Sequence, residues 1–260
     1  MRRLLRRSLK FLRLMTSSVW RRGLRHGVGA SIEHDAALKL LSPAMIVDIG
    51  ANRGQFALYC ADRFPGADII SFEPLAEPAA CYRRVFAGMR NVRLVEEAIG
   101  PEEKETQIHI SKRDDSSSLL PISKLQSSLF PGTELLETAT IRAAPLGASI
   151  EADAIAKPAL IKIDVQGFEL EALEGCKELL PQFRWAYVEC SYLELYEGQS
   201  LAPAVIAFLE DLGFRQTGEF NRVTDKSLGP VQAGFLFERQ ADGACSYKNC
   251  AQPRRPRSPA

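Results

Sequence analysis

From residue 44 onward, short apolar runs alternate with longer amphipathic segments, and this alternation limits the possible folds more than any other feature of the chain. The apolar runs predict strands at residues 44–49, 68–72, 92–95, 106–110, 159–165, 184–190 and 234–237. The amphipathic segments predict helices at residues 54–63, 76–86, 168–180 and 202–212. Strands that alternate with helices form a mostly parallel sheet with helices on both faces, so we expect one α/β domain.

The charges are distributed unevenly along the 260 residues. Residues 1–32 contain nine Lys or Arg and no carboxylate, whereas the remainder has 24 basic and 32 acidic side chains. A net acidic body argues against a nucleic-acid groove, so we expect no nucleic-acid partner. We predict a basic helical extension at residues 1–43, the main domain at 44–240 and a disordered tail at 241–260.

On a helical wheel, residues 1–25 form one basic amphipathic helix. This pattern fits two interpretations of equal weight: residues 1–22 adsorb to an anionic membrane, or the helix packs its apolar side on the domain. No apolar run approaches the ~20 residues that a membrane-spanning helix needs. The six cysteines form no CxxC pair, and we therefore expect a reducing, cytoplasmic location, with peripheral contact at the inner face of the membrane under the first interpretation.

The segment Asp48–Gly54 follows the first predicted strand and opens a helix. Its glycines permit a tight turn, and the helix N-terminus offers free N–H groups to an anion. A dinucleotide fingerprint needs glycine where this chain has Asn52, and no Gly-Lys-Ser/Thr follows for a P-loop. The methionine part of S-adenosylmethionine fits better, with its carboxylate on the helix N–H groups and its ammonium attracted by Asp48. A tight turn without a ligand is the alternative.

Two further strand ends carry candidate nucleoside contacts. Glu73 ends the second strand, where a carboxylate can accept both hydroxyls of a ribose, although it could instead cap the next helix. Ala98, after the third strand, provides a small apolar surface for an adenine ring.

Charged residues interrupt the apolar strand at 159–165. Lys162 and Asp164 require an explanation, because burying a charge is costly unless it is paired. Asp164 could cap the following helix or pair with Lys162, or it could face a reacting methyl group. Glu189, at the end of the next strand, would face the same cleft.

These segments carry a resemblance. Val47–Phe56, Phe72–Pro74 and Ile161–Glu169 resemble, in order and spacing, the FkbM family of S-adenosylmethionine-dependent methyltransferases over residues 44–240. The resemblance implies the class I methyltransferase fold, which is Rossmann-like, with a seven-stranded, mostly parallel sheet whose last strand is antiparallel. It implies a cofactor site at six positions, namely Asp48, Gly50, Asn52, Gly54, Glu73 and Ala98. Residues 116–119 resemble the serine-containing loop of the family, whereas residues 139–157 depart from its pattern.

We therefore expect an O-methyltransferase that uses S-adenosylmethionine and no metal, and acts on a small-molecule hydroxyl acceptor such as a sugar, glycolipid or polyketide. Asp164, Glu189 and Lys162 are the predicted catalytic residues, with His34 as another candidate base. Residues 111–138, rich in serine, are expected to form a loop or lid over the acceptor pocket. The alternatives are a dinucleotide-dependent oxidoreductase and a non-catalytic cofactor-binding module at a membrane.

Overall fold

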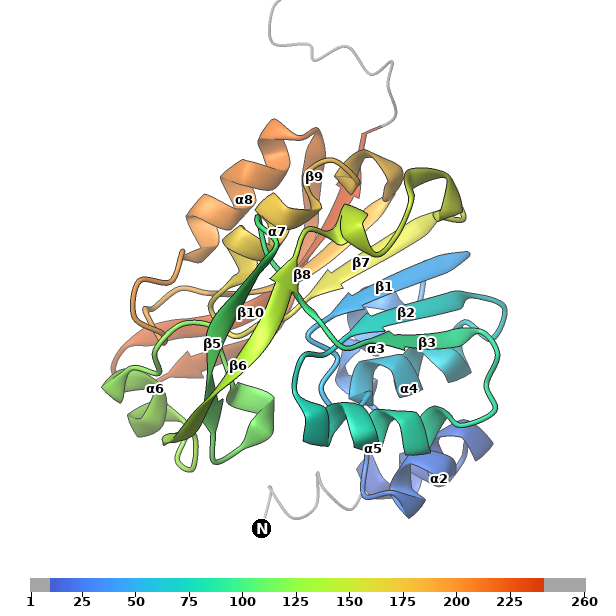
Figure 1. Ribbon diagram of the computed structural model, residues 1–260, viewed down its shortest axis with the longest axis horizontal. Helices are drawn as coiled ribbons and strands as arrows, with labels where there is room; N and C mark the ends of the chain where they lie inside the picture. The colour runs from blue at the N-terminus through green and yellow to red at the C-terminus, as the bar shows by residue number, and fades with distance from the viewer. Residues whose placement is uncertain (1–9, 241–260) are drawn as a thin grey trace, which may run out of the picture.

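The computed structural model describes residues 10–240, which form an α/β domain around a seven-stranded sheet (Figure 1). The strand order is β3-β2-β1-β7-β8-β10-β9. Five strands run parallel, and β10 is antiparallel to both of its neighbours. This arrangement confirms the expected fold. The strands are β1 Met45–Ile49, β2 Asp68–Phe72, β3 Val92–Val95, β7 Ala159–Ile163, β8 Trp185–Ser191, β9 Phe214–Asp225 and β10 Gly229–Arg239.

Helices cover both faces of this sheet, as the alternation of its side chains requires. Ile46 and Leu160 pack with α4 and α5, whereas Val47 and Ile161, one residue further along their strands, pack with α7 and α8. Because both faces are buried, every residue of β1 and β7 is apolar apart from Asp48 and Lys162. The helices are α3 Asp35–Leu38, α4 Gln55–Arg63, α5 Ala76–Phe86, α6 Lys124–Leu129, α7 Glu169–Cys176 and α8 Ala202–Asp211.

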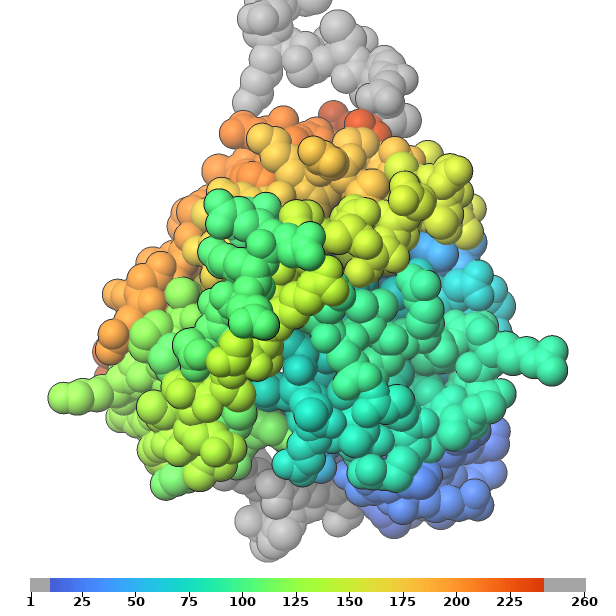
Figure 2. Space-filling view, in the orientation of Figure 1, coloured from blue at the N-terminus to red at the C-terminus, as the bar shows by residue number. Residues whose placement is uncertain are grey.

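A second, three-stranded sheet lies across the front of the molecule in Figures 1 and 2. It consists of β4 Ala98–Ile99, β6 Leu135–Ala144 and β5 Lys104–Ser111, in that order. The strand expected at residues 106–110 belongs here rather than at an edge of the main sheet. β6 and β9 were not predicted, because both are largely exposed and lack a continuous apolar run. Short 3-10 turns complete the fold: η1 Ile32–His34, η2 Asp114–Ser116, η3 Leu146–Ala148, η4 Ala152–Ala154 and η5 Leu180–Gln182.

The prediction of one continuous helix over residues 1–25 is wrong for the described part. Residues 10–14 are helical, but the helix is interrupted and a new one, α2 Ser18–Arg25, begins after Ser17. The Ser17 hydroxyl accepts the Trp20 N–H at 3.2 Å, a typical N-cap. The Trp20 indole donates to the Leu58 carbonyl at 3.1 Å, so α2 is fixed to α4. Residues 1–9 of the predicted helix and the predicted tail at 241–260 lie outside the described residues. Among residues 10–240, no helix combines the length and apolar character needed to span a bilayer.

Candidate active site

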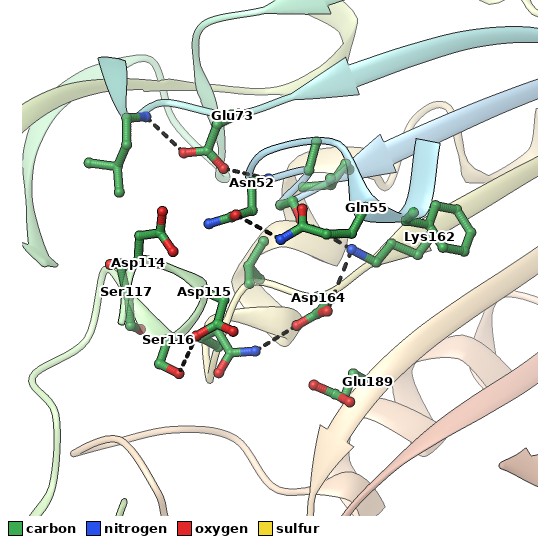
Figure 3. A pocket seen from close by; sticks show the side chains of 18 of the residues that line it. Asn52, Gln55, Glu73, Asp114, Asp115, Ser116, Ser117, Lys162, Asp164 and Glu189 are labelled. Carbon is green, nitrogen blue, oxygen red and sulfur yellow. Dashed lines mark hydrogen bonds and ion pairs between the residues drawn. The ribbon is translucent and has the colours of Figure 1, made fainter. Parts of the chain in front are cut away.

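A cavity of about 440 Å³ lies at the carboxyl ends of β1, β2, β7 and β8, where a parallel sheet binds its ligands. The loops that follow these strands line one side of the cavity, and residues 113–119 line the other. The expected loop at 111–138 therefore borders the cavity, although it also contains α6 and the start of β6. Figure 3 shows Glu73 and Glu189 at opposite ends of the site, with Asp164 nearer to Glu189.

The loop after β1 is locked to the loop after β7. Gly50 has φ +81°, and a Cβ built on it would lie 1.9 Å from the Asp164 carbonyl oxygen. The Lys162 ammonium also donates to the Gly50 carbonyl at 3.1 Å. Glycine is thus required at this position both for its backbone conformation and for space.

We expect Gly50→Ala to abolish cofactor binding or folding, because backbone atoms rather than a flexible side chain block the new methyl group. Gly198→Ala is the matched control: Gly198 has φ +79°, but nothing lies within 4 Å of its Cβ position. Urea unfolding and calorimetric titration with S-adenosylhomocysteine compare the two variants. If both variants lose the same stability and affinity, backbone strain alone explains why position 50 needs glycine, and the close approach of the two loops does not.

A row of buried polar side chains crosses three strands beneath this loop. Ser71, Asp48 and Lys162 are neighbours in the strand register. The Lys162 ammonium lies 3.2 Å from Asp48 Oδ1, and Asp48 is 0% exposed. Burial raises the pKa of Asp48 and the lysine charge opposes that rise. Asp48 does not line the cavity, and its carboxylate is paired with Lys162, so the attraction of the ligand's ammonium by Asp48 stays a prediction.

Gly54 also lies away from the cavity. It has φ +91° and begins α4, and a Cβ there would lie 2.5 Å from the Phe86 ring. Gly54 can thus contribute to the predicted cofactor site only through the shape of the turn. Gly50, Asn52, Glu73 and Ala98 do line the cavity.

The Glu73 carboxylate is held by two backbone donors. The N–H groups of Asn52 and Leu75 each donate to one of its oxygens at 2.8 Å. Burial, which outweighs these hydrogen bonds, raises the pKa of Glu73 to about 7. Asn52 adopts φ +48°, a conformation that asparagine tolerates better than most residues, and its side-chain oxygen accepts the Gln55 amide at 3.1 Å. Glu73 is thus fixed in the cavity wall, with Ala98 and Ile99 beside it.

Asp164 is held by two side chains at the opposite end of the site. Its Oδ2 lies 3.5 Å from the Lys162 ammonium, and its Oδ1 accepts the Gln166 amide at 2.7 Å. The side chain is 28% exposed and lines the cavity. The alternative that Asp164 caps α7 is wrong, because Phe168 is the N-cap residue of this helix and, within the described residues, no side-chain hydrogen bond caps its first turn. The alternative pairing with Lys162 is present.

Two more titratable groups face Asp164. Burial raises the pKa of Glu189 well above its ordinary value, and the charge of Asp164 adds to this effect. Burial, with help from the Lys162 charge, lowers the pKa of His34 to about 4. His34 Nδ1 lies 3.1 Å from the Tyr187 hydroxyl. His34 is therefore uncharged near neutral pH, and burial favours the uncharged form of Glu189.

Three residues to which the sequence analysis gave no role lie in or behind the cavity wall, Tyr196 behind it and Gln55 and Gln126 in it. The Tyr196 hydroxyl lies 2.9 Å from Gln166 Oε1 and 3.1 Å from the Ser116 carbonyl, so it joins the loop after β7 to residues 113–119. Gln55 and Gln126 line the cavity, and within residues 10–240 no hydrogen bond reaches the buried Oε1 atom of either. A buried acceptor without a donor is costly, which indicates that a ligand satisfies it. Only the tertiary fold brings Gln126 and Tyr196 near the site, whereas Gln55 directly follows the Asp48–Gly54 loop.

The profile of the methyltransferase FkbM domain matches residues 48–216 of this chain. The chain belongs to the FkbM methyltransferase family. It transfers a methyl group from S-adenosylmethionine, as the sequence analysis expected. The oxidoreductase and the non-catalytic module are thereby set aside.

Two curated relatives resemble this FkbM protein over most of their length. The 2-O-methyltransferase NoeI of Sinorhizobium fredii is 30% identical over 77% of this chain and 85% of its own. Methyltransferase sdnD of Sordaria araneosa is 28% identical over 78% of this chain and 84% of its own. Among solved structures, a putative tRNA (m1A22) methyltransferase of Streptococcus pneumoniae in complex with S-adenosylmethionine has a TM-score of 0.47 at 12% identity, covering 84% of this chain and 76% of its own.

Proposed function

We propose that this FkbM protein methylates a hydroxyl oxygen, with Asp164 as the base, and that residues 44–240 are the catalytic domain. The observation that carries the proposal is the position of Asp164: it lies in the cavity wall, held by Lys162 and Gln166, with no helix N–H bound to it. A relative named as a 2-O-methyltransferase supports an oxygen acceptor.

The residues around Glu73 suit the nucleoside of S-adenosylmethionine. Glu73 has both oxygens fixed by backbone N–H groups and can accept the ribose hydroxyls, while Ala98 and Ile99 provide an apolar wall for the adenine. The unsatisfied Gln55 oxygen lies beside Asn52, where it can accept from the ammonium group of the methionine part. When bound, the cofactor supplies an electrophilic methyl group on a sulfonium.

Asp164 performs two tasks in the proposed reaction. It orients the acceptor hydroxyl, because methyl transfer is an in-line displacement and positioning supplies much of the rate. It then accepts the hydroxyl proton as the new C–O bond forms, since an alcohol is a poor nucleophile until that proton leaves. The Lys162 ammonium, 3.5 Å from Asp164 Oδ2, helps to hold the carboxylate in place.

The acceptor end of the cavity is predominantly polar. Glu33, Glu189, Asn221 and Gln232 line it together with His34. Such a wall offers hydrogen bonds to several neighbouring hydroxyls, so we infer a polyhydroxylated acceptor, a sugar or the sugar part of a glycolipid, in preference to an apolar polyketide. A panel of glycosides and polyketide alcohols, assayed for S-adenosylhomocysteine formation, tests this. Turnover confined to polyketide alcohols, or to amines, would overturn it.

Glu73→Ala is expected to weaken S-adenosylhomocysteine binding by about 1–3 kcal/mol, the cost of leaving the ribose hydroxyls without their acceptor. Because burial raises the pKa of Glu73 to about 7, the carboxylate becomes protonated as the pH falls below that value. The affinity of the unaltered protein for S-adenosylhomocysteine should therefore decrease as the pH is lowered from about 7.5 to about 6. Above about pH 7.5 the affinity should be constant. Calorimetric titration at several pH values measures both effects. In Glu73→Gln this pH dependence should be absent, and its persistence would place the titrating group elsewhere.

A further inference from the structure

The segment before α2 exposes large apolar side chains. Phe11, Leu12 and Met15 are 54%, 64% and 44% exposed, whereas Leu14, on the same short helix, is buried in the core. We call Phe11, Leu12 and Met15 the apolar patch. Leu14 holds the short helix against the domain, while Phe11 and Leu12 on the same helix face outward. Adjacent exposed apolar side chains of this size mark an interaction surface.

Cations surround the apolar patch. Lys10 and Arg13 lie on the same segment, and the Arg21 side chain donates to the Met15 carbonyl at 2.8 Å. Two carboxylates face them: Glu33 lies 2.8 Å from Lys10 and Asp35 3.2 Å from Arg13. Residues 1–9, which directly precede the patch in sequence, add four arginines and no carboxylate. In sequence, residues 1–25 therefore combine apolar side chains with nine cations and no carboxylate, two of the cations being paired with Glu33 and Asp35, and this is the composition of a segment that lies in the headgroup region of an anionic bilayer.

The apolar patch adjoins the wall of the cavity. Lys10 lines the cavity and is the chain neighbour of Phe11, and its partner Glu33 lines the same wall. A molecule that enters past Lys10 therefore passes the patch. An amphiphile whose apolar part remains in a bilayer could present its polar head to Asp164 by this route.

We propose that residues 10–15 dock on an anionic lipid bilayer and turn the cavity entrance toward it, so that the methyl acceptor is an amphiphile held in the membrane. The docking part stands on the patch alone. The acceptor part rests on the proposed O-methyl transfer at Asp164.

Vesicle sedimentation of the full chain tests the docking. We expect binding to vesicles of phosphatidylcholine with phosphatidylglycerol, little binding to pure phosphatidylcholine, and a loss as salt rises from about 0.1 to about 1 M, where charges are screened within about 3 Å. Phe11→Gln/Leu12→Gln should lower the binding by at least about tenfold, since both side chains lose their burial in the bilayer. Deletion of residues 1–22 is a poorer test, because it would remove Trp20 from the core.

The chain offers a matched control in Leu135→Gln/Leu136→Gln. These neighbours on β6 are 50% and 61% exposed but lie outside the basic segment and the cavity wall. This variant should bind vesicles like the unaltered protein. All three proteins should bind S-adenosylhomocysteine equally in calorimetric titration, which shows that they are folded.

Three results would overturn the docking: equal vesicle binding by the Phe11/Leu12 variant, equal loss in the Leu135/Leu136 variant, or no binding to anionic vesicles. If the Phe11/Leu12 substitutions abolish self-association in sedimentation velocity instead, the apolar patch is an interface between two copies. The acceptor part predicts that this variant loses methyl transfer to amphiphiles in vesicles but not to a soluble glycoside. If the chain binds vesicles but methylates no hydroxyl in either assay, the proposed function fails and the docking stands.

Discussion

Asp164→Asn is expected to lower kcat on the hydroxyl acceptor by at least about 100-fold, the usual contribution of a general base. The amide keeps the shape and can still contact Gln166, but it cannot accept a proton or attract the Lys162 ammonium. Affinity for S-adenosylhomocysteine should stay within about twofold, because Asp164 lies at the end of the site opposite Glu73. Kinetic assays with calorimetric titration separate the two quantities.

Asp115→Asn is the control for this experiment. Asp115 also lines the cavity, but it pairs with the exposed Arg113 at 2.9 Å rather than with Lys162. We expect the kcat of Asp115→Asn to change by less than about threefold, because exposed ion pairs contribute little free energy. Near-normal turnover in Asp164→Asn would contradict the assignment of the base and direct attention to Glu189 or His34.

Lys162→Met is expected to lower the free energy of unfolding by about 3–5 kcal/mol, the usual cost of removing one partner from a buried ion pair. Asp48 would remain fully buried with only Ser71 nearby, at 3.5 Å. Without the lysine, burial alone acts on Asp48 and raises its folded pKa above the unfolded value. The folded state then binds more protons, so the loss of stability should be smaller at pH 5 than at pH 8. Urea unfolding at both pH values measures this.

The double variant Lys162→Met/Asp48→Leu removes both charges from the row beneath the loop. It should recover most of the lost stability, since a buried ion pair can be replaced by apolar side chains at little cost. It should not recover catalysis, because Asp164 also loses its cation. A loss below about 1 kcal/mol in the single variant would mean that Asp48 is neutral in the folded protein, contrary to the pairing described here.

The main sheet could be predicted where both faces of a strand are buried. β1, β2 and β7 are short apolar runs between turn residues, and their predicted bounds agree with the structure within two residues. β6 and β9 were missed because they are largely exposed, so that polar residues such as Thr138 interrupt any apolar run. The helix break at Ser17 was also missed, since the wheel pattern continues through it while the hydroxyl caps a new helix.

The position of the site followed from topology, but the direction of its side chains did not. The loops after parallel strands meet at one edge, which is why Gly50, Asn52, Glu73 and Asp164 were found. The pairing of Asp48 with Lys162 was not predicted, because it depends on strand register, which places the two residues directly opposite each other. Gln126 carries no local pattern, and only long-range packing brings it to the cavity, whereas Gln55 directly follows the Asp48–Gly54 loop but was given no role of its own.

The most direct test of the account follows the methyl group itself. The protein is incubated with S-adenosylmethionine labelled with carbon-13 at its methyl carbon and with a fraction of membrane glycolipids, and the products are analysed by carbon-13 NMR. The account predicts label in a methyl ether, formed by the unaltered protein and by Asp115→Asn but at most about 1% as fast by Asp164→Asn. Label on nitrogen or sulfur, or methyl ether formed equally fast by Asp164→Asn, would contradict it.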